Sequence, residues 1–150
     1  MTPDVTLAPG ADDNGLAHML AGLVSQNLQA KPHKVADFAA LDGRVAVVAD
    51  DADVALTLHF HAGGKLVIHD GIVGIPDLTI RGPSEAIIAL SNLPMTTPLG
   101  LPIPRPGDLE AVGAVRVVAS CLRHGKLRIY GAILHLPLFL KLGHVLSVNG

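Results

Sequence analysis

Aromatic residues, cysteine and charge are all scarce in this chain of 150 residues. Tryptophan is absent, and the aromatic side chains are three phenylalanines and one tyrosine. Nucleic-acid-binding proteins usually combine a basic face with stacking rings, so these counts and the net charge of −2 predict no nucleic-acid partner. The single cysteine excludes a disulfide framework and a four-cysteine zinc site. No apolar run of roughly eighteen residues is free of charge, so we predict no transmembrane helix.

Hydrophobic residues, by contrast, are abundant at 49% of the chain, whereas charged residues make up 16%. Disordered chains have few hydrophobic and many charged residues, so this composition predicts a folded protein. The length suits one domain with one core. Residues 1–14 contain proline, glycine and aspartate without periodicity and lack the apolar centre of a signal peptide. We therefore expect a flexible leader over 1–14 and a single soluble domain over 15–150, located in the cytoplasm.

Charge is distributed unevenly along the chain. Residues 1–75 carry a net charge of −5 and residues 76–150 a net charge of +3. Residues 111–150, the most apolar part, contain five basic residues and no acidic residue. A segment that is both cationic and apolar is typical of contact with an anionic lipid surface. The candidate membrane-docking residues are Arg116, Arg123, Lys126, Arg128 and Lys141. The alternative is a buried helix whose few charges mark its solvated side.

Several segments show the three-to-four-residue spacing of apolar side chains that predicts helices. They are residues 16–30, 34–41, 84–93 and 109–123, and a last helix that begins at Ile133 or Pro137 and ends at Val148. Asn14 is a candidate N-cap for the first helix, which Pro32 ends. Pro83 occupies the favoured first position of the helix that follows it, and Asp108 caps the next one.

Five segments are predicted to be strands from alternating or β-branched side chains and from the turn residues between them. They are residues 44–50, 54–61, 65–70, 77–82 and 126–130. A three-residue loop after His61 pairs Phe60 with Leu66 and Leu58 with Ile68, so the apolar side chains share one face. A two-residue loop would instead pair His61 with Leu66 and mix the faces, which favours the three-residue loop with Gly64 in the left-handed conformation.

Two features of the second half are unusual. Residues 94–107 contain five prolines, which excludes a helix and suits an extended lid or binding loop, with plain disorder as the alternative. The last predicted helix is apolar over most of its circumference, whereas a surface helix buries an arc of little more than 100°. Something besides the sheet must therefore cover it.

Four segments carry a resemblance to a known family. They read DGRVAVV at 42–48, HAGGKLVIHDG at 61–71, DLTIRGPSEAIIAL at 77–90 and GKLRIYG at 125–131. In sequence and order they resemble the sterol carrier protein type two (SCP2) family of lipid-binding domains, over roughly residues 16–148. The last segment is similar to the family's Gly-Lys-Leu-x-Ile-x-Gly strand before its closing helix.

The resemblance implies an α+β fold, with a five-stranded, mainly antiparallel sheet covered on one face by helices. An apolar tunnel between the two layers would hold a sterol, a fatty acyl chain or an isoprenoid. Two departures limit the transfer. The stretch between Gly82 and Gly125 is longer than the family pattern, which affects the shape of the tunnel, and the C-terminus is not a peroxisomal targeting signal.

Inward-facing periodicity and the resemblance together identify expected ligand-lining residues. On the strands these are Leu56, Leu58, Phe60, Leu66, Ile68, Leu78 and Ile80. On the helices they are Ile87, Leu136, Phe139, Leu140 and Leu142. We expect the protein to bind a hydrophobic lipid, to transfer or present it at an anionic membrane surface, and to need no cofactor.

Signals for metal binding or catalysis are weak. His59, His61 and His69 are predicted to share the solvated face of the sheet, which favours solvated histidines over a zinc site. Cys121 is expected to be a small core residue, and no Gly-x-Ser-x-Gly motif surrounds Ser120. The apolar segments contain no carboxylate that could act as a buried base. We therefore expect no enzyme, with a small enzyme acting on an apolar substrate as the minor alternative.

The main alternative is a scaffold module. In that interpretation the outer side of the last helix meets a partner, such as a second copy in a homodimer, and no ligand is bound. Such a protein would assist a pathway of lipid or quinone biosynthesis.

Overall fold

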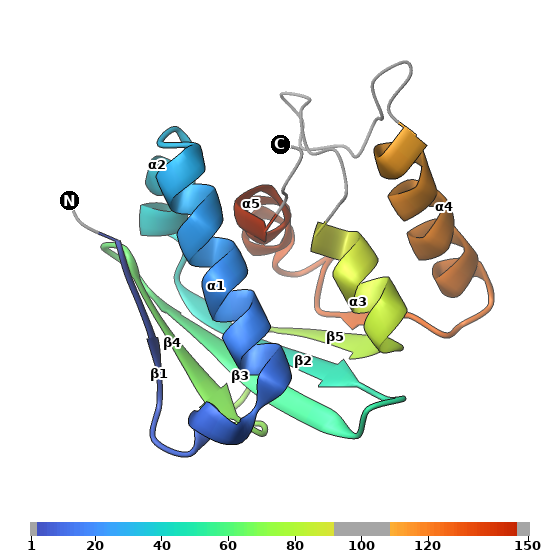
Figure 1. Cartoon of the computed structure of the whole chain (residues 1–150), viewed down its shortest axis with the longest axis horizontal. Coiled ribbons are helices and arrows are strands. Elements are labelled where there is room, and N and C mark those ends of the chain that lie inside the picture. Colours follow the sequence, from blue (N-terminus) through green and yellow to red (C-terminus); the bar gives the residue numbers. More distant parts are fainter. Residues whose placement is uncertain (1–2, 92–108, 147–150) are drawn as a thin grey trace.

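The computed structural model describes residues 3–91 and 109–146, which form an α+β fold of two layers (Figure 1). A mixed sheet has the strand order β1-β4-β3-β2-β5-β6, and the helices pack on one of its faces. The strands are β1 (Asp4–Leu7), β2 (Gly43–Ala49), β3 (Val54–His61), β4 (Lys65–Asp70), β5 (Leu78–Gly82) and β6 (Arg128–Tyr130). The helices are α1 (Gly15–Ala30), α2 (Lys34–Ala40), α3 (Ser84–Ser91), α4 (Leu109–Arg123) and α5 (Leu136–Leu146), with a short 3₁₀ turn, η1 (Ala11–Asp13).

The sheet differs from the prediction in strand number and in direction. The sixth strand is β1, which lies in the predicted flexible leader and runs parallel to β4. Its four residues stand between Pro3 and Pro9, a length too short for alternation to be recognised. The pairing of β2 with β5 is also parallel, so the sheet is mixed rather than mainly antiparallel. The prediction of five strands is therefore wrong, and the predicted leader over 1–14 contains strand β1 and the turn η1.

The register of the β3–β4 hairpin agrees with the prediction. Phe60 pairs with Leu66 and Leu58 with Ile68, so these four side chains share the inner face of the sheet. The loop contains Gly63 and Gly64, with φ angles of 102° and 94°. Residues with a side chain rarely adopt this left-handed backbone conformation, which is why a glycine pair is suited to the turn.

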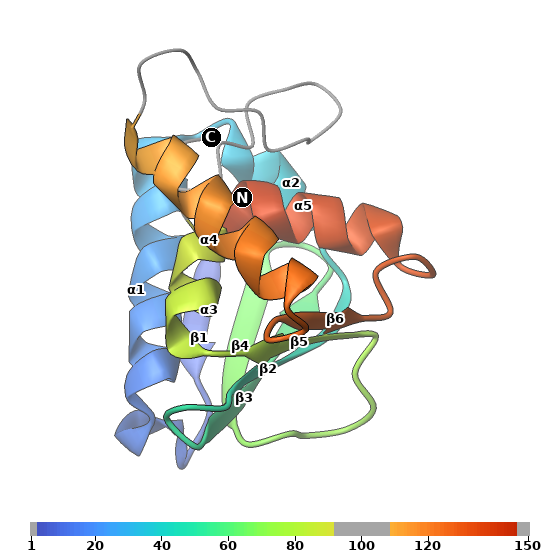
Figure 2. The ribbon, with the colours of Figure 1, turned by 90° about the vertical axis from the view of Figure 1, so that its right-hand side faces the viewer.

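The connection between β4 and β5 crosses the outer face of the sheet, opposite the helices (Figure 2). It must cross because β3 and β2 separate the two strands that it joins. The Thr57 hydroxyl fixes its first half by donating to the Gly71 carbonyl at 2.8 Å and accepting from the Val73 amide at 2.9 Å. The second half ends at Asp77, whose carboxylate accepts from the Arg44 amide at 3.0 Å.

Helix α1 begins and packs as its sequence pattern predicts. The Asn14 side chain accepts from the Ala17 amide at 3.1 Å, which confirms it as the N-cap. Leu20, Val24 and Leu28 form the buried stripe that faces the sheet. Strand β6 is shorter than predicted, and α5 begins at Leu136, between its two predicted starts. The predicted end of that helix at Val148 and the proline-rich residues 94–107 lie outside the described residues.

Candidate functional site

The apolar layer between the sheet and the helices contains most of the predicted ligand-lining residues. Nine of the twelve belong to one buried cluster: Leu56, Leu58, Phe60, Leu66, Ile68, Leu78, Ile80, Ile87 and Leu142. Phe139 is partly buried and packs against this cluster. Leu140 is half-buried, and Leu136 is 49% exposed on the first turn of α5. The structure thus brings the strand residues together and places the beginning of α5 at the edge of the apolar layer.

The predicted lining residues on the sheet are tightly covered. Leu56, Leu58 and Phe60 on β3 have no exposed surface, and the same holds for Leu66 and Ile68 on β4. Side chains of α1, together with Phe38 of α2, supply part of this cover. A ligand can contact the sheet residues only if a helix moves away from them, since close-packed interiors leave no space for a chain.

Helix α5 is held to α1 and α2 at its C-terminal end. The Asn27 side-chain amide is buried on α1 and donates to the carbonyls of Val145 and Leu146, at 3.0 Å each. His144 forms a short contact with the Asp37 carboxylate on α2. The two bonds from Asn27 satisfy carbonyls that the end of a helix leaves without intrahelical partners.

The other half of α5 is much less firmly held. The buried side chains of α5, Leu142 and Val145, both belong to its C-terminal half. Leu138 and Phe139 pack at the edge of the core, and Leu136 lies open. Among the residues that the structure describes, few buried contacts oppose a movement that lifts the N-terminal half of α5, and such a movement would uncover apolar side chains.

Helix α1 contributes residues that were not predicted for this layer. Leu20, Val24 and Leu28 belong to the same buried cluster as the strand residues. Their spacing marks the buried face of the helix, but it does not show which part of the sheet that face covers.

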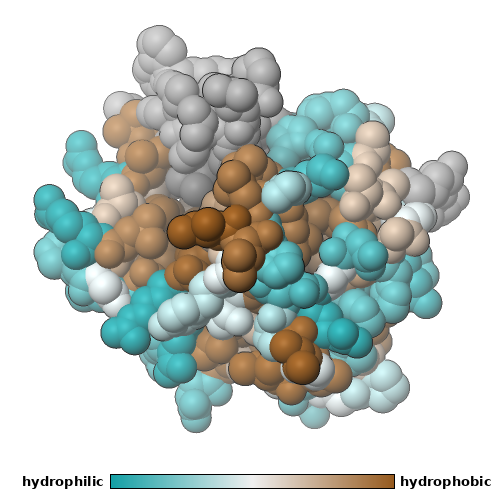
Figure 3. Space-filling view, turned by 180° about the vertical axis from the view of Figure 1, so that it is seen from behind, coloured by the Kyte–Doolittle hydropathy of each residue, from teal (hydrophilic) through white to brown (hydrophobic). Residues whose placement is uncertain are grey.

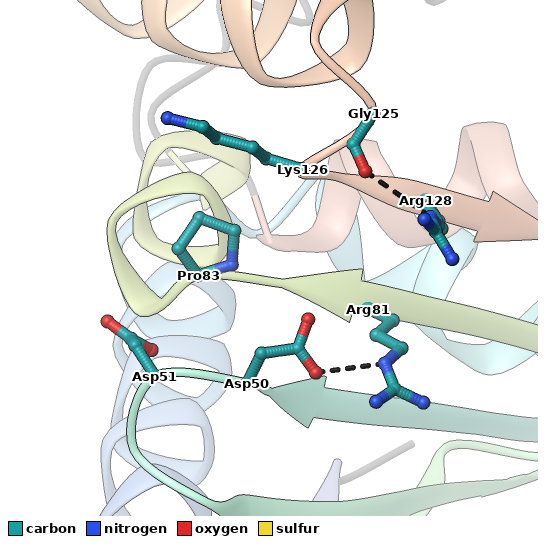
Figure 4. A pocket seen from close by; sticks show the side chains of 7 residues that line it. All are labelled: Asp50, Asp51, Arg81, Pro83, Gly125, Lys126 and Arg128. Atoms are coloured by element: carbon teal, nitrogen blue, oxygen red, sulfur yellow. Dashed lines mark hydrogen bonds and ion pairs between the residues drawn. The ribbon is translucent and has the colours of Figure 1, made fainter.

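A second candidate site is a polar pocket of about 620 Å³ at the edge where β2 and β5 end and β6 begins (Figure 4). It is lined by Asp50, Asp51, Arg81, Pro83, Gly125, Lys126 and Arg128. Arg81 Nε lies 2.8 Å from Asp50 Oδ1, so these two charges are paired. Arg128 Nε donates to the Gly125 carbonyl at 3.2 Å.

The carboxylates of this pocket have structural roles. Asp51 Oδ1 accepts from the Ser84 amide and the Ser84 hydroxyl, each at 2.8 Å, and so caps α3. The backbone hydrogen bond from Ser84, followed by the one from its side chain, lowers the pKa of the exposed Asp51 carboxyl. The pocket is open, and its lining includes no cysteine, histidine or serine that could act as a nucleophile or base. Its basic groups could hold a small anion, but the arrangement does not indicate catalysis.

Three histidines lie on the outer face of the sheet, as predicted. The ring centroid of His59 is 3.9 Å from that of His61 and 6.3 Å from that of His69. Burial lowers the pKa of His59, and the nearby His61, Arg44 and His69 add to this effect, whereas Asp42 opposes it. In the described ranges 3–91 and 109–146, no group of three or more histidine, cysteine, aspartate or glutamate side chains is placed to hold a metal ion.

The predicted membrane-docking residues are spread over several elements. Arg116 and Arg123 are exposed on α4, Lys126 and Arg128 line the polar pocket, and Lys141 is half-buried on α5. No helix within the described part of the chain is long and apolar enough to cross a membrane. Cys121 is buried in the core cluster, as predicted.

The two-layer architecture is that of an SCP2-like α+β domain, which confirms the resemblance at the level of the fold. Among solved structures, the chain is similar to one described as "UbiJ-SCP2 Ubiquinone synthesis protein". The TM-score is 0.55 at 15% sequence identity, and the match covers 87% of this chain and 94% of that chain. No protein-family model matches the sequence, and no curated protein matches it.

Proposed function

We propose that this protein binds a hydrophobic lipid with a long chain, such as an acyl or isoprenoid chain, without transforming it. The observation that carries the proposal is the continuous apolar layer of an SCP2-like fold beneath a loosely held helix. The ligand would lie between the sheet and the N-terminal half of α5, next to Leu138 and Phe139. The twelve lining residues predicted from the sequence remain the proposed contact set.

The energetics of such a ligand favour exchange with a membrane. Burying an alkyl chain contributes about 0.8 kcal/mol per CH₂, or about 13 kcal/mol for a chain of about sixteen carbons. A bilayer offers the same chain a similar gain. The protein therefore needs only to match the bilayer in affinity, and lifting part of α5 costs some of that gain. This balance suits the proposed transfer or presentation of the lipid.

Titration with a fluorescent long-chain fatty acid tests the binding. We expect saturable binding to the whole chain, and weaker binding to the Phe139→Arg variant, whose charge would lie at the edge of the apolar layer. Leu122→Arg is the matched control because Leu122 is exposed on α4. Phe139→Leu keeps an apolar side chain and should retain binding, which separates a specific effect from poor folding. Non-saturable binding to the wild-type protein would refute the proposal.

A second candidate function is that of an accessory or scaffold protein in a quinone pathway. It is favoured by the similar structure described as a ubiquinone synthesis protein and by the apolar side chains exposed around the start of α5. Analytical ultracentrifugation distinguishes it from lipid binding. An obligate homodimer that takes up no fluorescent fatty acid would support the scaffold, whereas a monomer that binds the probe would support the lipid carrier.

A further inference from the structure

Two connections on the side of the sheet away from α1 expose several aliphatic side chains each. The β4–β5 connection exposes Ile72, Val73 and Ile75, and the β6–α5 connection exposes Ile133 and Leu134. The exposed fractions of Ile75, Ile133 and Leu134 are 86%, 94% and 85%. Single exposed apolar residues are normal, but aliphatic side chains that protrude together are typical of an interaction site. We call the group Ile72, Val73, Ile75, Ile133 and Leu134 the aliphatic rim.

The two connections lie next to each other although they are far apart in sequence. A Cβ atom at Gly131 would lie 2.3 Å from the Asp77 carbonyl oxygen, so the end of one connection touches the start of the other. Both project toward the same side of the molecule in Figure 2. The space-filling view from behind shows hydrophobic side chains exposed in separate groups on this face, with hydrophilic ones between and around them (Figure 3).

Basic side chains accompany the aliphatic rim. The Arg44 guanidinium lies against Gly74 of the β4–β5 connection, since a Cβ there would be 2.9 Å from Arg44 Nε. That Nε is buried and has no hydrogen-bond partner within the described residues. Arg128 is exposed on β6, two residues from the half-exposed Tyr130. Of the carboxylates nearby, Asp77 accepts from the Arg44 amide and Asp50 pairs with Arg81.

We propose that the aliphatic rim, together with Arg44 and Arg128, docks the protein on the surface of an anionic lipid bilayer. Protruding aliphatic side chains can enter the interfacial region, while arginines beside them contact lipid phosphates. A second copy of the chain fits this face less well, since a symmetric contact would bring the arginines of both copies into one interface. This surface deepens the proposed function, on which it rests, because a lipid carrier must reach the bilayer that holds its ligand.

Co-sedimentation with vesicles of phosphatidylcholine and phosphatidylglycerol tests the docking surface. The double variant Ile133→Ser with Leu134→Ser should lower the bound fraction by about tenfold, because two aliphatic anchors are lost. Met19→Ser with Leu122→Ser removes two exposed apolar side chains from α1 and α4 and should bind like the wild type. Binding should also weaken in high salt and on vesicles of phosphatidylcholine alone.

Three results would overturn this docking surface: equal losses in the rim and control variants, equal binding to phosphatidylcholine alone, or no vesicle binding by the wild type. A wild-type dimer that the rim variant converts to a monomer would assign the surface to a second copy instead. Circular dichroism verifies folding, and Ile75→Ser provides an independent rim variant. Titration with the fluorescent fatty acid in the absence of vesicles should be unchanged in all variants. Loss of docking is thereby distinguished from loss of ligand binding.

Discussion

Lys34 is a basic side chain of α2 with no exposed surface. Burial lowers its pKa to about 8, the charge of Lys31 adds to this effect, and Asp37 opposes it. The folded-state pKa thus lies below the usual value of 10.5, so between these two pH values the unfolded chain holds a proton that the folded protein has released. The free energy of unfolding should therefore rise with pH across that window.

The Lys34→Met variant tests this assignment, because it removes the titrating group and keeps a side chain of similar length. Urea unfolding between pH 7 and 10.5 should show a clear rise in stability for the wild type and a flatter curve for the variant. Parallel curves for the two proteins would show that Lys34 does not titrate in this range.

His59 gives a second experimental window, at lower pH and with the same direction of change. Its pKa is lowered in the folded protein, chiefly by burial and then by His61, Arg44 and His69. As the pH falls below the ordinary value of 6.5, the unfolded chain takes up the proton first, so this contribution to stability is lost. His59→Gln should reduce the loss of stability between neutral and mildly acidic pH, as measured by thermal unfolding. His18→Gln on α1 serves as the control, and an equal reduction there would contradict the assignment.

At the scale of elements, the side chain of Asn27 determines how firmly α5 is held. Replacing it by alanine removes two hydrogen bonds to the carbonyls of Val145 and Leu146 and leaves buried polar atoms without partners. We expect a loss of about 1–3 kcal/mol in stability and faster hydrogen exchange in α5 than in the sheet. Gln26→Ala, one residue earlier and exposed, is the control. Uniform exchange across the molecule would contradict an anchoring role.

The start of the β6–α5 connection requires glycine. Gly131 has a φ of 86°, and a Cβ atom there would meet the Asp77 carbonyl oxygen at 2.3 Å. Gly131→Ala should therefore lower stability by about 1–3 kcal/mol through strain and a shift of the backbone. Gly22→Ala provides the contrast, because Gly22 lies within α1 with nothing within 4 Å of its Cβ position. That substitution should stabilise the protein by up to about 1 kcal/mol in chemical denaturation. The same sign for both variants would contradict the account.

Considering the whole molecule, alternation of side chains was sufficient to predict which strand residues face the core. It predicted the β3–β4 register because one slip would move Leu58 and Phe60 to the solvated face. Alternation does not determine which strands become neighbours, so the parallel pairing of β2 with β5 could not be predicted. Strand β1 was missed because four residues carry too little periodicity.

The candidate site was predictable to a similar extent. The apolar face of the sheet follows from the sequence pattern, whereas the segment that became α5 is apolar nearly all round and its pattern does not indicate the covered side. Leu136 was therefore predicted in the interior and lies 49% exposed. The contact between the two connections of the aliphatic rim depends on long-range topology, which no local signal reveals.

Native mass spectrometry of the chain, purified without detergent, tests the central claim of lipid binding most directly. The account predicts a population heavier than the bare chain by the mass of a long-chain lipid. Organic extraction should remove that mass, and incubation with the extract should restore it. A spectrum that contains only the bare chain, before and after incubation with the extract, would contradict the account.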